Sequence, residues 1–252
     1  MCIYFIGDIM SQTVYAYFLS TIAGMSTLIG TVLIFIKKIN KNKFISKCLF
    51  FSSGVMLYVS FFDLIPESFN IFTSIFYLFP SIILLLIFLV LGIITSSFIE
   101  RKVNKKNSLY KIGIVSMIAI ILHNIPEGII TFLSYNTSVG TSLLIAIALH
   151  NIPEGISISI PIFYSTNSKL KAFFYTFISG LSEPFGALIA HIFLSNLNTN
   201  IMCYLFAFTA GIMIQISVFE LIKEAHKLKE KGSVLYLFLG IFLMYLSHLI
   251  TK

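Results

Sequence analysis

The stretches Ile121-Leu-His-Asn-Ile-Pro-Glu-Gly-Ile-Ile130 and Ala148-Leu-His-Asn-Ile-Pro-Glu-Gly-Ile-Ser157 decide the fold of this chain. Both carry the same hexapeptide, His-Asn-Ile-Pro-Glu-Gly, near the middle of a long apolar run. Ionisable side chains at that depth of a membrane helix are costly and usually functional. The two hexapeptides therefore predict a pair of polar sites in neighbouring membrane helices.

Apolar runs of the same kind continue outward through the whole chain. Apolar residues make up 58% of the sequence and charged residues only 11%, whereas soluble domains carry about 25% charged residues. A helix needs roughly 20 apolar residues to cross the hydrocarbon core, and eight runs meet that length. We expect an all-α integral membrane protein, one transmembrane domain over residues 1–252. Its eight helices are predicted near Val14–Ile36, Phe44–Phe69, Tyr77–Ile99, Tyr110–Ser134, Thr141–Tyr164, Ala172–Leu194, Ile201–Ile222 and Val234–Ile250.

The basic residues lie in alternate connections between these runs. They follow the first, third, fifth and seventh runs, as Lys37, Lys38, Lys41, Lys43 and Lys47; Arg101, Lys102, Lys105, Lys106 and Lys111; Lys169 and Lys171; and Lys223, Lys227, Lys229 and Lys231. The positive-inside rule assigns these four connections to the cytoplasm. We therefore expect a cell-membrane protein with both termini outside, and the net charge of +7 needs no nucleic-acid partner.

Residues 53–67 and 210–224 resemble each other without a gap, including two acidic positions. The first segment belongs to the second predicted helix and the second to the seventh, and these helices run in opposite directions. The match predicts an inverted repeat, as in many secondary transporters; a chance likeness between two apolar helices is the alternative. The repeat would place acids at both mouths of a pathway: Asp63 and Glu67 outside, and Glu220 and Glu224 inside.

The two hexapeptides have the composition of a metal site. Within each, the histidine and glutamate are four residues apart and share a helix face. The fourth and fifth helices are antiparallel, so two imidazoles and two carboxylates can converge, a donor set that suits zinc, iron and manganese. Glu183 in the sixth run adds a third carboxylate, which leaves room for two ions. The candidate ligands are His123, Asn124, Glu127, His150, Asn151, Glu154 and Glu183; an interhelical hydrogen-bond clamp is the alternative.

Two further histidines lie nearer the ends of helices. His191, near the outer end of the sixth helix, could pass metal inward, and His226, among lysines of the last basic connection, could receive it on exit. For each of them, an incidental interfacial or solvated histidine is the alternative.

The two hexapeptides, the stretch Ser179-Gly-Leu-Ser-Glu-Pro184 and the acidic ends of the second and seventh helices resemble the Zrt/Irt-like (ZIP) family of metal transporters, in particular its bacterial ZupT and GufA type. The resemblance implies eight helices in an inverted 3+2+3 arrangement, a tendency to form homodimers, and alternating access in which helices 1, 4, 5 and 6 slide against helices 2, 3, 7 and 8. It also implies a binuclear centre. One site would use His123, Glu127, His150 and Glu154, and the other Asn124, Glu127, Asn151, Glu154 and Glu183. The chain lacks the His-rich loop between helices 3 and 4 that many members have.

We therefore expect a protein that is no enzyme and takes up Zn²⁺ into the cytoplasm, with Fe²⁺, Mn²⁺ or Cd²⁺ as further substrates. The alternatives are an intramembrane zinc-dependent hydrolase, a membrane metal sensor without transport, and a proton or organic-cation carrier that uses the same acids.

Overall fold

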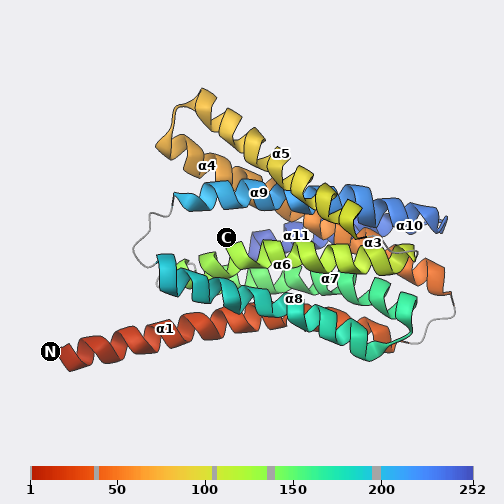
Figure 1. Cartoon of the computed structure of the whole chain (residues 1–252), viewed down its shortest axis with the longest axis horizontal. Helices are drawn as coiled ribbons and strands as arrows, with labels where there is room; N and C mark the ends of the chain where they lie inside the picture. The colour runs from red at the N-terminus through yellow and green to blue at the C-terminus, as the bar shows by residue number, and fades with distance from the viewer. Residues whose placement is uncertain (1, 37–39, 104–106, 135–139, 195–199, 252) are drawn as a thin grey trace.

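The computed structural model describes residues 2–36, 40–103, 107–134, 140–194 and 200–251, and helices make up nearly all of them (Figure 1). The elements join end to end into eight continuous rods. They are α1 (Cys2–Met25), α2 (Thr27–Gly30) and η1 (Thr31–Phe35); α3 (Lys41–Tyr58), η2 (Val59–Leu64) and α4 (Ile65–Ile75); α5 (Leu78–Lys102); α6 (Ser108–Ser134); α7 (Gly140–Thr166); α8 (Lys169–Ile189) and η3 (Ala190–Leu194); α9 (Ile201–Gln215), η4 (Ile216–Ile222) and α10 (Lys223–Lys227); and α11 (Leu235–Thr251).

Each predicted apolar run lies on one of these rods, but capping residues rather than hydropathy set some of the ends. The side chain of Asn40 accepts the backbone N–H of Lys43 at 2.9 Å, so α3 begins before its apolar run does. Ser168 caps α8 in the same way through the N–H of Lys171. Such caps satisfy backbone donors that the first helical turn leaves open, and the predicted starts were therefore a few residues late.

Six of the rods are long and apolar enough to cross a membrane within the described residues: Thr13–Phe35, Lys41–Ile75, Leu78–Lys102, Ser108–Leu133, Lys169–Phe193 and Ile201–Lys227. Leu235–Leu249 is a shorter apolar helix, and α7 has 27 residues. The chain is thus an all-helical, multi-pass membrane protein.

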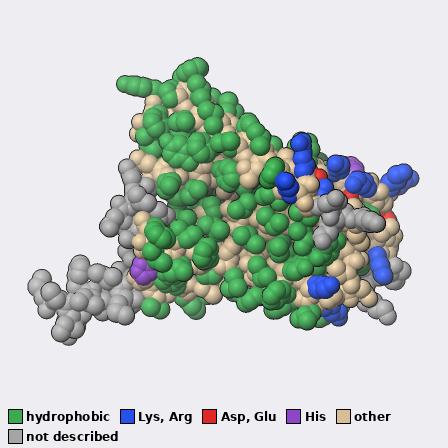
Figure 2. All heavy atoms as spheres, viewed as in Figure 1, with side chains coloured by type: hydrophobic (Ala, Val, Ile, Leu, Met, Phe, Trp, Pro, Cys, Tyr) green, Lys and Arg blue, Asp and Glu red, His purple; other side chains and the backbone are tan. Residues whose placement is uncertain are grey.

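The surface agrees with a bilayer environment. Hydrophobic side chains cover the flank of the bundle in Figure 2, and Lys and Arg gather at the end on the right. On α5, Phe79, Leu86, Ile94 and Phe98 are each more than half exposed, as expected of a helix that faces lipid. We call the end with the lysines the basic end; Lys37, Lys38, Lys105 and Lys106 lie outside the described residues.

Close backbone contacts between rods occur in matched pairs. In each, a glycine meets the backbone of a neighbouring helix where a Cβ would not fit. Between α3 and α11 these contacts are Gly54 with Leu237 and Gly240 with Phe51, and between α9 and α5 they are Gly211 with Leu89 and Gly92 with Phe208. Gly54 and Gly211 are equivalent in the sequence match between residues 53–67 and 210–224, which extends to Phe51 and Phe208. The α3–α11 crossing and the α9–α5 crossing therefore use the same positions.

The helices around the centre show a second matched set. Gly30 meets the backbone of Ile152 and Gly155 meets that of Thr27, which joins the first rod to α7. The corresponding contacts between α8 and α6 are Gly186 with Ile125 and Gly128 with Glu183. Ile152 and Ile125, and likewise Gly155 and Gly128, hold the same places in the two hexapeptides. Each hexapeptide therefore packs against a neighbouring helix through an equivalent pair of glycine contacts.

The two similar segments, residues 53–67 and 210–224, also share a backbone irregularity that was not predicted from the sequence. η2 (Val59–Leu64) and η4 (Ile216–Ile222) are π-helical and begin at equivalent positions. π-helical turns are rare and occur often at functional sites. Here they contain Asp63 and Glu220, the first acidic residue of each segment.

Candidate metal centre

The predicted ligands lie together on three central helices. α6 supplies His123, Asn124 and Glu127, α7 supplies their counterparts His150, Asn151 and Glu154, and α8 supplies Glu183. All seven residues are buried, and none is more than 6% exposed. Burial of this many polar groups is unfavourable unless they bind one another or a ligand.

The imidazoles and carboxylates of the two hexapeptides meet each other. His123 Nε2 lies 3.0 Å from Glu127 Oε1 and 3.1 Å from Glu154 Oε1. His150 Nε2 lies 2.9 Å from the same oxygen of Glu127. Ligand atoms of His123, Glu127 and His150 all fall within 4.8 Å of one another, so one cation could reach all three.

The asparagines of both hexapeptides donate hydrogen bonds to carboxylates. Asn151 Nδ2 donates to Glu183 Oε2 and to the backbone carbonyl of Ala23, both at 2.9 Å. With its amide turned so that the nitrogen faces acceptors, Asn124 donates to Glu154 Oε2 at 3.2 Å and to the carbonyl of Ile120 at 3.1 Å. Each asparagine thereby fixes a glutamate contributed by the next helix in the chain. The first rod takes part through Ala23, and also through Ser26, whose hydroxyl donates to the carbonyl of Ala148 at 3.0 Å.

Several buried polar atoms of this cluster find no hydrogen-bond partner among the described residues. They are His123 Nδ1, Glu127 Oε2, Asn151 Oδ1 and Glu183 Oε1. Apart from this one histidine nitrogen, all are oxygen acceptors. A cluster of unpartnered carboxylate, amide and imidazole atoms fits a divalent transition metal, which binds these donor types.

The three residues predicted for the outer mouth lie apart from this cluster. Asp63 Oδ1 is 3.1 Å from His248 Nδ1 on α11, and Glu67 is exposed on α4. His191 is exposed in η3, where Nδ1 lies 2.9 Å from the Tyr17 hydroxyl and the ring stacks on Phe132 with 5.5 Å between centroids. No role for His248 was predicted from the sequence, because its contact with Asp63 depends on how α11 packs against the second rod.

The three residues predicted for the inner mouth lie on η4 and α10, at the basic end. Glu220 and Glu224 are buried. Glu224 accepts from Ser108 at 2.6 Å and from Lys227 at 2.9 Å. His226 is exposed and sets its ring against the edge of Phe50, with 5.0 Å between centroids.

Glu100 belongs beside them and was missed. Its carboxyl interacts with that of Glu220 and accepts from Lys111 at 2.7 Å. Its position in the sequence gave one signal, since an acid stands at the end of an apolar run next to Arg101. The contact itself depends on the α5–α9 crossing.

The chain is similar to known proteins over most of its length. Residues 101–248 match the family model described as ZIP Zinc transporter. The chain is 39% identical to Zinc transporter ZupT of Streptococcus mutans, with 90% of this chain and 94% of that protein covered. It is 35% identical to Zinc transporter ZupT of Clostridium perfringens (97% and 98% covered) and 37% identical to that of Oceanobacillus iheyensis (90% and 94%).

The family match begins just before α6 and includes both hexapeptides and Glu183. Similarity to the relatives extends over most of the chain, and the members of this family are transporters rather than enzymes. This confirms the expectation of a membrane transporter and removes the hydrolase alternative. The chain belongs to the ZIP zinc transporter family.

Proposed function

We propose that this protein carries Zn²⁺ across the cell membrane into the cytoplasm through the cluster of His123, Glu127, His150 and Glu154. The observation that carries the proposal is the buried convergence of these four side chains from α6 and α7, where His123 Nδ1 and Glu127 Oε2 have no hydrogen-bond partner among the described residues. The relatives named above are zinc transporters, which supports zinc as the substrate. Fe²⁺, Mn²⁺ and Cd²⁺ suit the same donors and are further candidate substrates.

The centre has the ligands for a second ion. Asn124, Asn151 and Glu183 border the first cluster, and Glu127 and Glu154 could bridge two ions. The unpartnered oxygens of Asn151 and Glu183 support this second site. In the binuclear arrangement, Glu183 would turn from its Asn151 donor toward metal.

The pathway is proposed to run between two acidic mouths in a single domain over residues 1–252. Eight spanning helices would put the basic end in the cytoplasm and both termini outside. Asp63, Glu67 and His191 would then attract hydrated metal, while Glu220, Glu224 and His226 would receive it. Glu100 joins the inner group because it interacts with Glu220.

Two groups of helices are proposed to slide past each other during alternating access. The matched glycine crossings support an inverted 3+2+3 repeat, because α3–α11 and α9–α5 use equivalent positions. The same holds for the crossings that brace α6 and α7. Helices 1, 4, 5 and 6 (the rod that begins with α1, then α6, α7 and the rod that begins with α8) would carry the metal. Helices 2, 3, 7 and 8 (the rod that begins with α3, then α5, the rod that begins with α9, and α11) would form the frame. The protein is proposed to pair as a homodimer.

Zinc influx into proteoliposomes loaded with a fluorescent zinc indicator tests the proposal. Saturable influx should disappear in Glu127→Ala/Glu154→Ala and persist in Glu230→Ala, which removes an acid far from the cluster in sequence. Zinc binding without influx in the wild type would instead favour a metal sensor. Influx that persists in the double variant would show that zinc passes elsewhere.

A further inference from the structure

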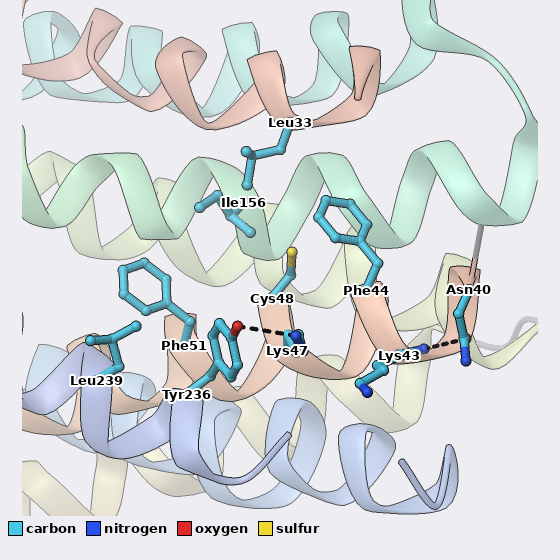
Figure 3. Close-up of a pocket in the computed structure, with 10 residues that line it drawn as sticks. All are labelled: Leu33, Asn40, Lys43, Phe44, Lys47, Cys48, Phe51, Ile156, Tyr236 and Leu239. Carbon is cyan, nitrogen blue, oxygen red and sulfur yellow. Dashed lines mark hydrogen bonds between the residues drawn. The ribbon is translucent and has the colours of Figure 1, made fainter. Parts of the chain in front are cut away.

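A cavity of about 500 Å³ opens at the basic end, and none of the candidate metal ligands lines it. It lies where η1 and α7 on one side meet α3 and α11 on the other (Figure 3). Leu33 and Ile156 form its wall on the first side, and Phe51 and Leu239 form it on the second. The walls are therefore apolar.

The polar side of the cavity is positively charged. Lys43 and Lys47 line it together with Asn40, and among the described residues that line it none is acidic. Lys47 Nζ donates to the Tyr236 hydroxyl at 3.0 Å and lies 4.6 Å from the centre of that ring. Tyr236 thus holds the Lys47 ammonium in place without neutralising it.

Lys43 is the second source of charge. Its side chain is exposed, and it forms no ion pair with an acid in the described part of the chain. Two cations beside an apolar cavity between membrane helices have the chemistry that anionic lipid head groups recognise. A soluble anion would use the lysines but leave the apolar walls in contact with water.

We propose that this cavity binds an anionic phospholipid, with the phosphate against Lys43 and Lys47 and the first part of an acyl chain along Leu33, Phe51 and Leu239. Leu239 is 48% exposed on the flank of α11, so the chain can continue into the surrounding bilayer. The volume falls within the usual range for small-ligand sites, about 300–1,000 Å³.

The lipid would touch both groups of helices that are proposed to slide, because η1 and α7 belong to one group and α3 and α11 to the other. This consequence rests on the proposed function. The binding itself does not, since it can be measured in protein that moves no metal.

Native mass spectrometry of the purified full chain, titrated with phosphatidylglycerol or phosphatidylcholine in mild detergent, tests the proposal. Lys43→Gln/Lys47→Gln should weaken phosphatidylglycerol binding about 30-fold, since each lysine contributes roughly 1 kcal/mol to such binding. Lys229→Gln/Lys231→Gln removes the same charge from exposed residues of the same end and should leave the affinity within about twofold of wild type. Glu127→Ala should still bind the lipid, which separates this result from any failure of transport.

A second readout uses the native thiol of Cys48, which lines the cavity and is 6% exposed. Phosphatidylglycerol should slow maleimide labelling of Cys48, whereas phosphatidylcholine and inorganic phosphate should not. Leu33→Trp, which fills the cavity without changing charge, should also weaken phosphatidylglycerol binding. Equal protection by inorganic phosphate, equal binding of both lipids, or equal loss in the two lysine double variants would each overturn the proposal.

Discussion

Glu127 is the carboxylate on which both imidazoles of the centre converge, at 3.0 Å from His123 and 2.9 Å from His150. Glu127→Gln keeps its shape and removes its charge. We expect zinc affinity to fall by about 100-fold or more, because even the residues that only orient ligands contribute 10- to 100-fold. Isothermal titration of the purified protein measures this, with Glu230→Gln as the matched control. An affinity equal to that of Glu230→Gln would exclude Glu127 as a ligand.

Asn151 has a different role, since its Nδ2 donates to Glu183 and to the Ala23 carbonyl. Asn151→Asp replaces this donor with a negative charge beside a buried carboxylate. We expect a stability loss of about 1–3 kcal/mol in metal-free protein, and zinc should restore part of it by neutralising both acids. Thermal unfolding in EDTA and in zinc measures both effects. A melting temperature that is unchanged in EDTA would show that the Asn151 contacts add little stability.

Acid should weaken zinc binding. Imidazoles and carboxylates bind metal only when deprotonated, so zinc and protons compete for the same four side chains. The apparent Kd should therefore rise as the pH falls from 7.5 to 5.5, and zinc binding should release protons. Titrations in buffers of different ionisation enthalpy count these protons. A pH-independent Kd with no proton release would mean that zinc binds at other groups.

The sequence predicted that the hexapeptide residues converge, but not how they pair. The spacing of histidine and glutamate within each hexapeptide put both on one face, because a helix turns about 100° per residue. The bonds from Asn124 to Glu154 and from Asn151 to Glu183 cross between helices, and helix period alone does not determine them. The contacts of Glu100 and His248 were missed for the same reason, since they depend on crossing angles and helix rotation.

At the scale of helices, the crossing of α6 and α8 depends on Gly128. A Cβ there would overlap the backbone carbonyl of Glu183, so Gly128→Ala must push α8 away from the centre. We expect a loss of about 1–3 kcal/mol together with weaker zinc binding, because Glu183 moves with its helix.

Gly113→Ala is the matched control for this change. It lies on the same helix, but its Cβ would chiefly meet the flexible end of the Ile162 side chain, so both stability and zinc binding should change less. Thermal unfolding and zinc titration of the two variants give the comparison. Equal effects would mean that the α6–α8 distance does not control the site.

The helices themselves were largely predictable, and their irregularities were not. Apolar length identified all eight rods, because hydropathy reports the need to avoid water. The π-helical turns of η2 and η4 left no trace in the sequence, since a change in backbone hydrogen-bond register alters neither hydropathy nor charge. The starts of α3 and α8 were predicted a few residues too late, because Asn40 and Ser168 cap these helices before the apolar runs begin.

For the whole molecule, the proposed orientation can be tested by labelling from one side. In a variant without the native cysteines, Lys229→Cys lies at the basic end and Phe76→Cys follows α4 near the opposite end. A membrane-impermeant maleimide added to intact cells should label Phe76→Cys and reach Lys229→Cys only after permeabilisation. The reverse pattern would place the basic end outside and reverse the proposed direction of uptake.

The π-helical turns η2 and η4 also have a mechanical consequence. Each has hydrogen bonds that span one residue more than those of an α-helix, and we expect this extra residue to be able to move along the rod as neighbouring backbone hydrogen bonds change partners. Each residue that it passes rotates by about 100° around the helix axis, while the rod stays unbroken and within its lipid surroundings. Asp63 and Glu220 lie on these turns. Such a shift would rotate the acidic side chain around the helix axis, toward or away from the pathway, without bending the helix.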